Sequence, residues 1–115
     1  MGSYWILDGD RQPRKARDVL EWARQFEAMD RRVGLTSTRL HRISTVWLGL
    51  DHSHGSGGPP MLFETMVFDR HGESGAESDI EGSMVRYSTW DEAEAGHAAT
   101  VSRIERLEKA ALTLL

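Results

Sequence analysis

The chain has 115 residues, 39% of them hydrophobic, with no cysteine and a formal net charge of −4 at pH 7. A chain of that length makes one domain, residues 1–115, and buries enough surface to fold without disulfide bonds. The negative charge argues against a protein that binds through nucleic-acid phosphates, and the sequence shows neither a signal peptide nor an apolar run that would span a membrane. We therefore expect a cytoplasmic protein.

The first half of the chain predicts a strand, a helix and a long hairpin. Residues 4–7 form a short apolar strand, and Asp18 is a good N-cap for an amphipathic helix. Residues 31–39 are a weaker strand candidate. Residues 43–50 and 61–68 are rich in β-branched and aromatic side chains, which predicts two strands paired as an antiparallel hairpin.

The second half predicts a polar surface loop, one further strand and a long helix. The loop covers residues 69–83 and the strand covers residues 84–88. Thr89 and Glu92 have the spacing of a capping box, so a C-terminal helix should begin near Trp90. The order β-α-β-β-β-β-α predicts an α+β fold, in which two helices pack on an antiparallel sheet of four to five strands.

The strand at residues 61–68 has apolar side chains on both of its faces. Met61, Phe63 and Val67 point to one side, whereas Leu62, Met66 and Phe68 point to the other. Helices on one face of the sheet would leave the second face exposed, and exposed apolar faces mark association. We therefore expect a homodimer or a higher oligomer.

The stretch WLGLDHSHGSGGPP, residues 47–60, collects polar side chains and glycines between the two strongest strands. Glu64 and His97 are polar residues inside otherwise apolar patterns, and such residues need a partner when they are buried. If the C-terminal helix crosses the sheet near this stretch, Asp51, His52, Glu64 and His97 converge on one site.

Such a site has two chemical interpretations. In the first, the amides of the glycine turn bind an anion, with Arg42 or Arg86 nearby, and an aromatic ring stacks on a base. The ligand-binding residues would then be Trp47, Asp51, His52, Gly57, Gly58, Glu64, Tyr87 and His97. In the second, His52, Glu64 and His97 ligate a divalent metal, although their spacing matches no specific metal motif and we expect no cofactor.

Structural explanations for the same residues stay open. Glu64 and His97 would equally serve as hydrogen-bonded core residues, and the glycine turn as a plain hairpin connection. The chain has no cysteine nucleophile, no G-x-S-x-G elbow and no phosphate-binding P-loop. These absences favour a protein that is not an enzyme, and the sequence leaves the question open.

Three segments and a fourth ahead of them resemble a family of small, mostly uncharacterised proteins encoded by bacteriophages and prophages. The segments are STVWLGLDHS (44–53), GPPMLFETMVF (58–68) and RYSTWDEAEAGH (86–97), preceded by EWARQFEAMDRRV (21–33). The resemblance covers most of residues 4–106 and implies no established activity. His52, Glu64 and His97 fall inside the matching motifs, whereas His54 departs from the aromatic or similar residue typical of its position.

The resemblance implies a phage protein acting in the cytoplasm of the host cell. The leading hypothesis is a binding protein that modulates the host, for example an anti-defence protein that sequesters a nucleotide-like signal or blocks a host protein. Its partner would be a small anionic ligand or a host protein. The alternatives are a metal-dependent hydrolase using His52, Glu64 and His97 with Asp51, and a structural or assembly protein of the virion.

Overall fold

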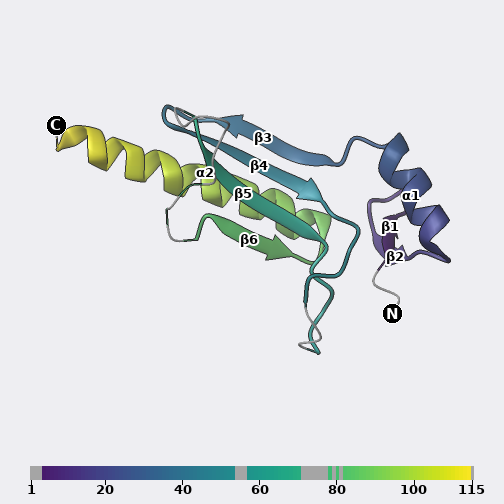
Figure 1. The fold of residues 1–115 in the computed structure, drawn as a ribbon. Coiled ribbons are helices and arrows are strands. Elements are labelled where there is room, and N and C mark those ends of the chain that lie inside the picture. The colour runs from purple at the N-terminus through teal and green to yellow at the C-terminus, as the bar shows by residue number, and fades with distance from the viewer. Residues whose placement is uncertain (1–3, 54–56, 71–77, 79, 81, 115) are drawn as a thin grey trace.

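The computed structural model describes the chain except for residues 1–3, 54–56, 71–77, 79, 81 and 115 (Figure 1). The predicted α+β class and the long C-terminal helix are confirmed. The elements are β1 (Trp5–Leu7), β2 (Pro13–Lys15), α1 (Val19–Ala28), β3 (Arg32–Ser37), β4 (His41–Trp47), β5 (Phe63–Asp69), β6 (Met84–Tyr87) and α2 (Trp90–Thr113). The predicted surface loop at 69–83 falls largely on residues 71–77, 79 and 81, outside the described part.

The main sheet is a four-stranded antiparallel meander in the order β3-β4-β5-β6. The predicted central hairpin is confirmed, because β4 pairs with β5 over their whole length, from His41 opposite Asp69 to Trp47 opposite Phe63. The weaker strand candidate at residues 31–39 is present as β3, which has a register irregularity between Arg32 and Gly34. Simple up-and-down connectivity follows from strands that are consecutive in the sequence.

The N-terminal elements form a small unit of their own at one end of the main sheet (Figure 1). The strand at residues 5–7 does not join the main sheet, because it pairs instead with β2, which the sequence did not predict. The α1 helix packs on β1, where the Gln25 amide bonds both the N–H and the C=O of Leu7, at 2.9 and 2.7 Å. The expectation that both helices cover one sheet is therefore wrong.

The N-terminal unit joins the core of the main sheet through Leu7, which is buried in one cluster with Trp47 and Phe63, and through several further contacts. The Trp5 N–H donates to the Gly49 carbonyl at 2.8 Å, and Tyr4 forms an isolated bridge with Leu50. Arg11, in the left-handed region with φ 62°, places its guanidinium 4.5 Å from the ring centre of Trp90. A ten-residue helix and a two-stranded hairpin are marginal alone, so these contacts stabilise them.

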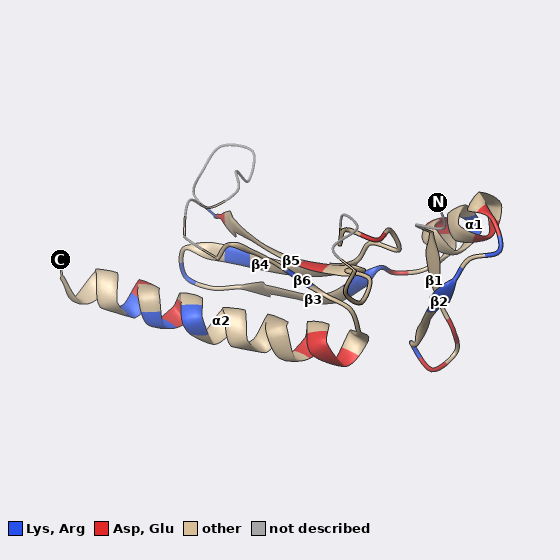
Figure 2. Cartoon of the chain, turned by 90° about the horizontal axis from the view of Figure 1, so that it is seen from below, with Lys and Arg blue, Asp and Glu red and all other residues tan. Residues whose placement is uncertain are grey.

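The α2 helix lies along one face of the main sheet, and the two form the core (Figure 2). Its capping box at Thr89 and Glu92 is present as predicted. One core cluster gathers Trp47, Phe63 and Ala93, and a second gathers Ile43, Val67 and Ile104. Alternation along β4 and β5 sends every second side chain into this layer. No described helix is long and apolar enough to cross a membrane.

Gly96 permits the close approach of α2 to the edge strand β6. A Cβ atom at this position would collide with the ring of Tyr87, so the glycine is required by packing although it weakens the helix. Glycine at this position makes the helix less stable by about 1 kcal/mol than alanine would, but it allows β6 to pack closely against α2.

We expect Gly96→Ala to reduce the free energy of unfolding by about 1 to 3 kcal/mol, because overpacking outweighs the gain in helix propensity. In a Tyr87→Ala background the same substitution should stabilise the protein by up to about 1 kcal/mol. Urea unfolding of the four proteins in this double-mutant cycle measures both effects. A stabilising Gly96→Ala in the otherwise unchanged chain would contradict the packing explanation.

Candidate functional site

His97 lies between α2 and the main sheet, where it joins three strands. Its Nε2 is 2.8 Å from Thr36 Oγ1 on β3, and its Nδ1 is 2.7 Å from Thr45 Oγ1 on β4, which in turn contacts Thr65 Oγ1 on β5 at 2.5 Å. Gly34 makes room for the imidazole, since a Cβ there would lie 2.9 Å from the ring. Burial lowers the pKa of His97, so the ring is held neutral. Both ring nitrogens are already occupied by hydroxyl groups.

Glu64 lies on the opposite face of the sheet from His97. Its carboxylate pairs with Arg86 on β6, with 3.0 Å between Nε and Oε2. The adjacent residue Thr65 points toward His97, and neighbouring residues in a strand point to opposite faces. The predicted convergence of Glu64 with His97 is therefore wrong.

Asp51 and His52 hold together the neck of the loop between β4 and β5. The Asp51 Oδ1 accepts the N–H groups of Ser53 and Met61 at 2.8 and 3.1 Å. The bond from Ser53 is the main cause that lowers the pKa of Asp51, and the bond from Met61 adds to it. The His52 N–H donates to the Met61 carbonyl at 2.9 Å, and its Nδ1 donates to the Leu50 carbonyl at 2.8 Å. Both residues thus serve loop geometry.

The aromatic residues expected to stack on a base are used in packing. Trp47 is only 1% exposed and lies edge-on to Phe63 in the core. The ring of Tyr87 packs against Gly96 of α2. Gly57, with φ 82°, and Gly58 are exposed in the loop. The structure therefore does not assemble the predicted ligand-binding set into one pocket.

The metal hypothesis also lacks geometric support. Within the described ranges, no group of three or more His, Asp or Glu side chains is placed to hold a metal ion. His52 lies at the loop neck, whereas Glu64 and His97 lie on opposite faces of the sheet. His54 lies outside the described residues.

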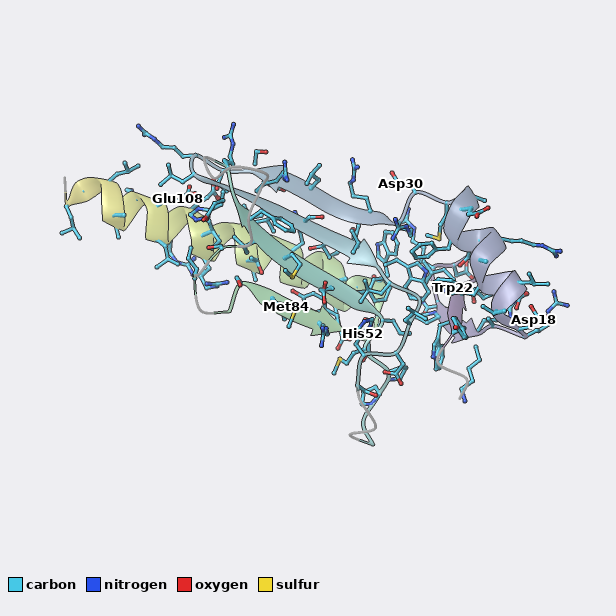
Figure 3. The ribbon with its side chains drawn as sticks, in the orientation of Figure 1. Asp18, Trp22, Asp30, His52, Met84 and Glu108 are labelled. Carbon is cyan, nitrogen blue, oxygen red and sulfur yellow. The ribbon has the colours of Figure 1, made fainter. Side chains whose placement is uncertain are left out.

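The sequence analysis missed a buried carboxylate near the far end of α2. Glu108 is 5% exposed and meets the β3–β4 turn at the opposite end of the sheet from His52 (Figure 3). It accepts hydrogen bonds from Thr38 Oγ1 at 2.7 Å, from the N–H groups of Arg39 and Leu40 at 3.2 and 2.9 Å, and from His41 Nδ1 at 2.6 Å. Both carboxylate oxygens are occupied, so Glu108 anchors the turn to the helix.

The environment of Glu108 explains why it remains ionised. Burial alone raises the pKa of Glu108, but hydrogen bonds from Thr38, His41 and Leu40 and the charge of His41 outweigh burial and lower it overall. His41 also approaches Asp69, with 3.5 Å between Nε2 and Oδ1. One signal was visible in the sequence: Glu108 interrupts the apolar helical stripe after Ile104, just as His97 does earlier.

The side of the main sheet that faces away from α2 has no structural use among the described elements, and we call it the open face. No described helix or strand covers it (Figure 2). Its middle rung consists of Leu35, Ser44, Met66 and Met84, and the outer rungs consist of Ser37, Arg42 and Phe68, and of Arg32, Val46, Glu64 and Arg86. Leu35 and Met84 are 46% and 44% exposed.

The open face corresponds in part to the second apolar surface predicted from residues 61–68. Met66 and Phe68 lie on it as expected. Leu62 does not, because it precedes the first residue of β5 and is fully buried in the core. The face is thus apolar at its centre and charged on both sides. Comparison with protein-family models, with curated proteins and with solved structures found no match to this chain.

We expect the stability to fall as the pH drops below about 6.5, the ordinary pKa of histidine. Because the pKa of His97 is lowered in the folded state, the unfolded chain takes up a proton first, and stability is lost at up to about 1.4 kcal/mol per pH unit. Urea unfolding between pH 7.5 and 5 measures this slope. His97→Gln should flatten it, whereas Thr36→Val, which leaves the imidazole buried, should retain it. An unchanged slope in His97→Gln would refute the assignment.

Glu108→Gln should reduce the free energy of unfolding at pH 7 by about 2 kcal/mol or more, because an amide group would meet donors that now bind a carboxylate. The exposed Glu105, about one turn earlier, provides the matched control in Glu105→Gln. Since the pKa of Glu108 is lowered, its contribution is present above pH 4.5 and disappears as the pH falls through the folded-state value. The difference between wild type and Glu108→Gln should therefore shrink toward pH 3, and a constant difference would contradict this account.

Proposed function

We propose that this chain is a binding protein that covers a surface of a partner protein with its open face. In this proposal it is a phage protein, acts in the cytoplasm of the host and modulates the host by blocking one of its proteins. The observation that carries the proposal is the open face itself, whose apolar centre no described element covers.

The exposure of large apolar side chains on this face supports binding of a partner protein. Leu35 and Met84 are each more than two-fifths exposed, and they lie in one rung across the sheet, with Ser44 and Met66 between them. Large contiguous apolar patches are rare on monomeric proteins, because burial of apolar surface is favourable by about 25 cal/mol per Å². A partner that covers this rung would gain that free energy.

The other versions of the function have less support. A nucleotide-like ligand would need an available ring, but Trp47 is in the core and Tyr87 packs on α2. A hydrolase would need converging ligands, and Glu64 and His97 lie on opposite faces. Blocking of a protein is therefore the version we propose. Self-association of the chain stays a prediction.

The test compares two leucines with almost equal exposure on different sides of the molecule. Leu35 on the open face is 46% exposed, and Leu107 on α2 is 45% exposed. A host protein that copurifies with the wild type should be purified and titrated by calorimetry against wild type, Leu35→Gln and Leu107→Gln. We expect 1:1 binding that Leu35→Gln weakens at least ten-fold and Leu107→Gln leaves unchanged.

Three results would overturn the proposal. They are the absence of a stoichiometric protein partner, equal binding by wild type and Leu35→Gln, and stoichiometric binding of a ligand from a nucleotide panel. Circular dichroism of each variant separates loss of binding from loss of folding. Because both leucines are exposed, both variants should keep the wild-type melting temperature within a few degrees.

A further inference from the structure

We infer that the open face binds an acidic amphipathic helix of its partner, an inference that rests on the proposed function. Two observations carry it: the charges around the apolar centre of the face and the dimensions of the sheet. The core does not use this face, since the core lies between α2 and the other side of the sheet.

The charged residues of the open face are mostly basic. On the described strands of this face, Arg32, Arg42 and Arg86 stand against the carboxylate of Glu64, and Asp30 lies beside Arg32 and Val46 at one end, on a chain whose net charge is −4. Glu64 is already paired with Arg86 at 3.0 Å. Two arginine side chains, those of Arg32 and Arg42, form no ion pair with a described residue. The strands of this face therefore carry more positive than negative charge, although the chain as a whole is acidic.

Arg42 is the residue best placed to select an acidic partner. It is exposed, and its guanidinium lies 5.7 Å from the ring centre of Phe68, beside the apolar rung. A guanidinium in this position keeps its donors available for a carboxylate that arrives with an apolar side chain. The attraction between this guanidinium and a carboxylate of the partner is stronger at a partly buried protein surface than in bulk water.

The same charges argue against a second copy of this chain as the occupant. Two open faces brought together would place six arginines around two glutamates that already have partners. Like charges in such an interface cost several kcal/mol. A partner with an acidic rim does not incur this cost, whereas a second copy does.

The dimensions of the face favour a helix over a whole domain. With three spacings of about 4.8 Å across the four strands and steps of about 3.4 Å along the longest strands, the face measures roughly 14 by 20 Å. That is roughly a third of the ~800 Å² that a standard interface buries on each partner. A helix rises about 1.5 Å per residue, so about 14 residues cross the face. A helix here would complete a second layer opposite α2.

The experiment uses two fluorescein-labelled 16-residue helical peptides that share one stripe of leucine and phenylalanine. One peptide carries glutamate beside the stripe and the other carries lysine. Fluorescence anisotropy with the full chain should give at least ten-fold tighter binding of the glutamate peptide at low salt. The difference should shrink as sodium chloride screens the charges.

Variants separate the charge preference from the binding itself. Arg42→Glu should abolish or reverse the preference for the glutamate peptide, and Arg106→Glu, an exposed arginine of α2, should leave it unchanged. Leu35→Gln should weaken both peptides in parallel, because it removes apolar contact without changing charge. Equal binding of both peptides that Leu35→Gln still weakens would overturn the acidic partner and leave the proposed function standing.

Two further outcomes would overturn the inference. If neither peptide binds and sedimentation shows a dimer that Leu35→Gln dissociates, a second copy occupies the face. If the lysine peptide binds as tightly as the glutamate peptide to Arg42→Glu and to wild type alike, the arginines do not select the partner. Sedimentation at micromolar concentration is therefore run on wild type and Leu35→Gln alongside the titrations.

Discussion

The structure depends on the packing of one helix, α2, on one face of the four-stranded sheet. Two polar residues of α2 fix that packing: His97 contacts hydroxyl groups of β3 and β4, and Glu108 accepts hydrogen bonds from the β3–β4 turn. They are eleven positions apart, about three helical turns, so they face the sheet together. Apolar contacts between them supply the burial, while the polar contacts fix where along the sheet the helix lies.

This packing explains why the conspicuous polar residues do not converge in one place. A buried imidazole or carboxylate is costly without partners, and here each one has its partners in the fold. Both ring nitrogens of His97 are hydrogen-bonded to threonine hydroxyls, and Asp51 bonds the two sides of the loop between β4 and β5. Among the described residues, the feature that the fold does not use is a surface, and for this reason the function proposed is binding.

The placement of charge gives that surface its character. The chain is acidic as a whole, but the described strands of the open face carry three arginines and one glutamate, and that glutamate, Glu64, already pairs with Arg86. A basic, apolar face on an acidic protein favours partners with acidic surfaces, as the proposal requires. The function and the partner proposed above both follow from the fact that one helix covers only one side of the sheet.

The sequence by itself determined the elements whose signals are local. Alternation in residues 61–68, the cap at Asp18 and the capping box at Thr89 predicted the central hairpin and both helix starts, and the apolar residues on both faces of β5 predicted an uncovered surface. Only the tertiary structure decided what lies against each face. It sent Glu64 and His97 to opposite sides, placed the first strand in a separate sheet, and joined Glu108 to Thr38, 70 positions away. Periodicity tells which residues share a side of an element, but the neighbour on that side depends on contacts between distant parts of the chain.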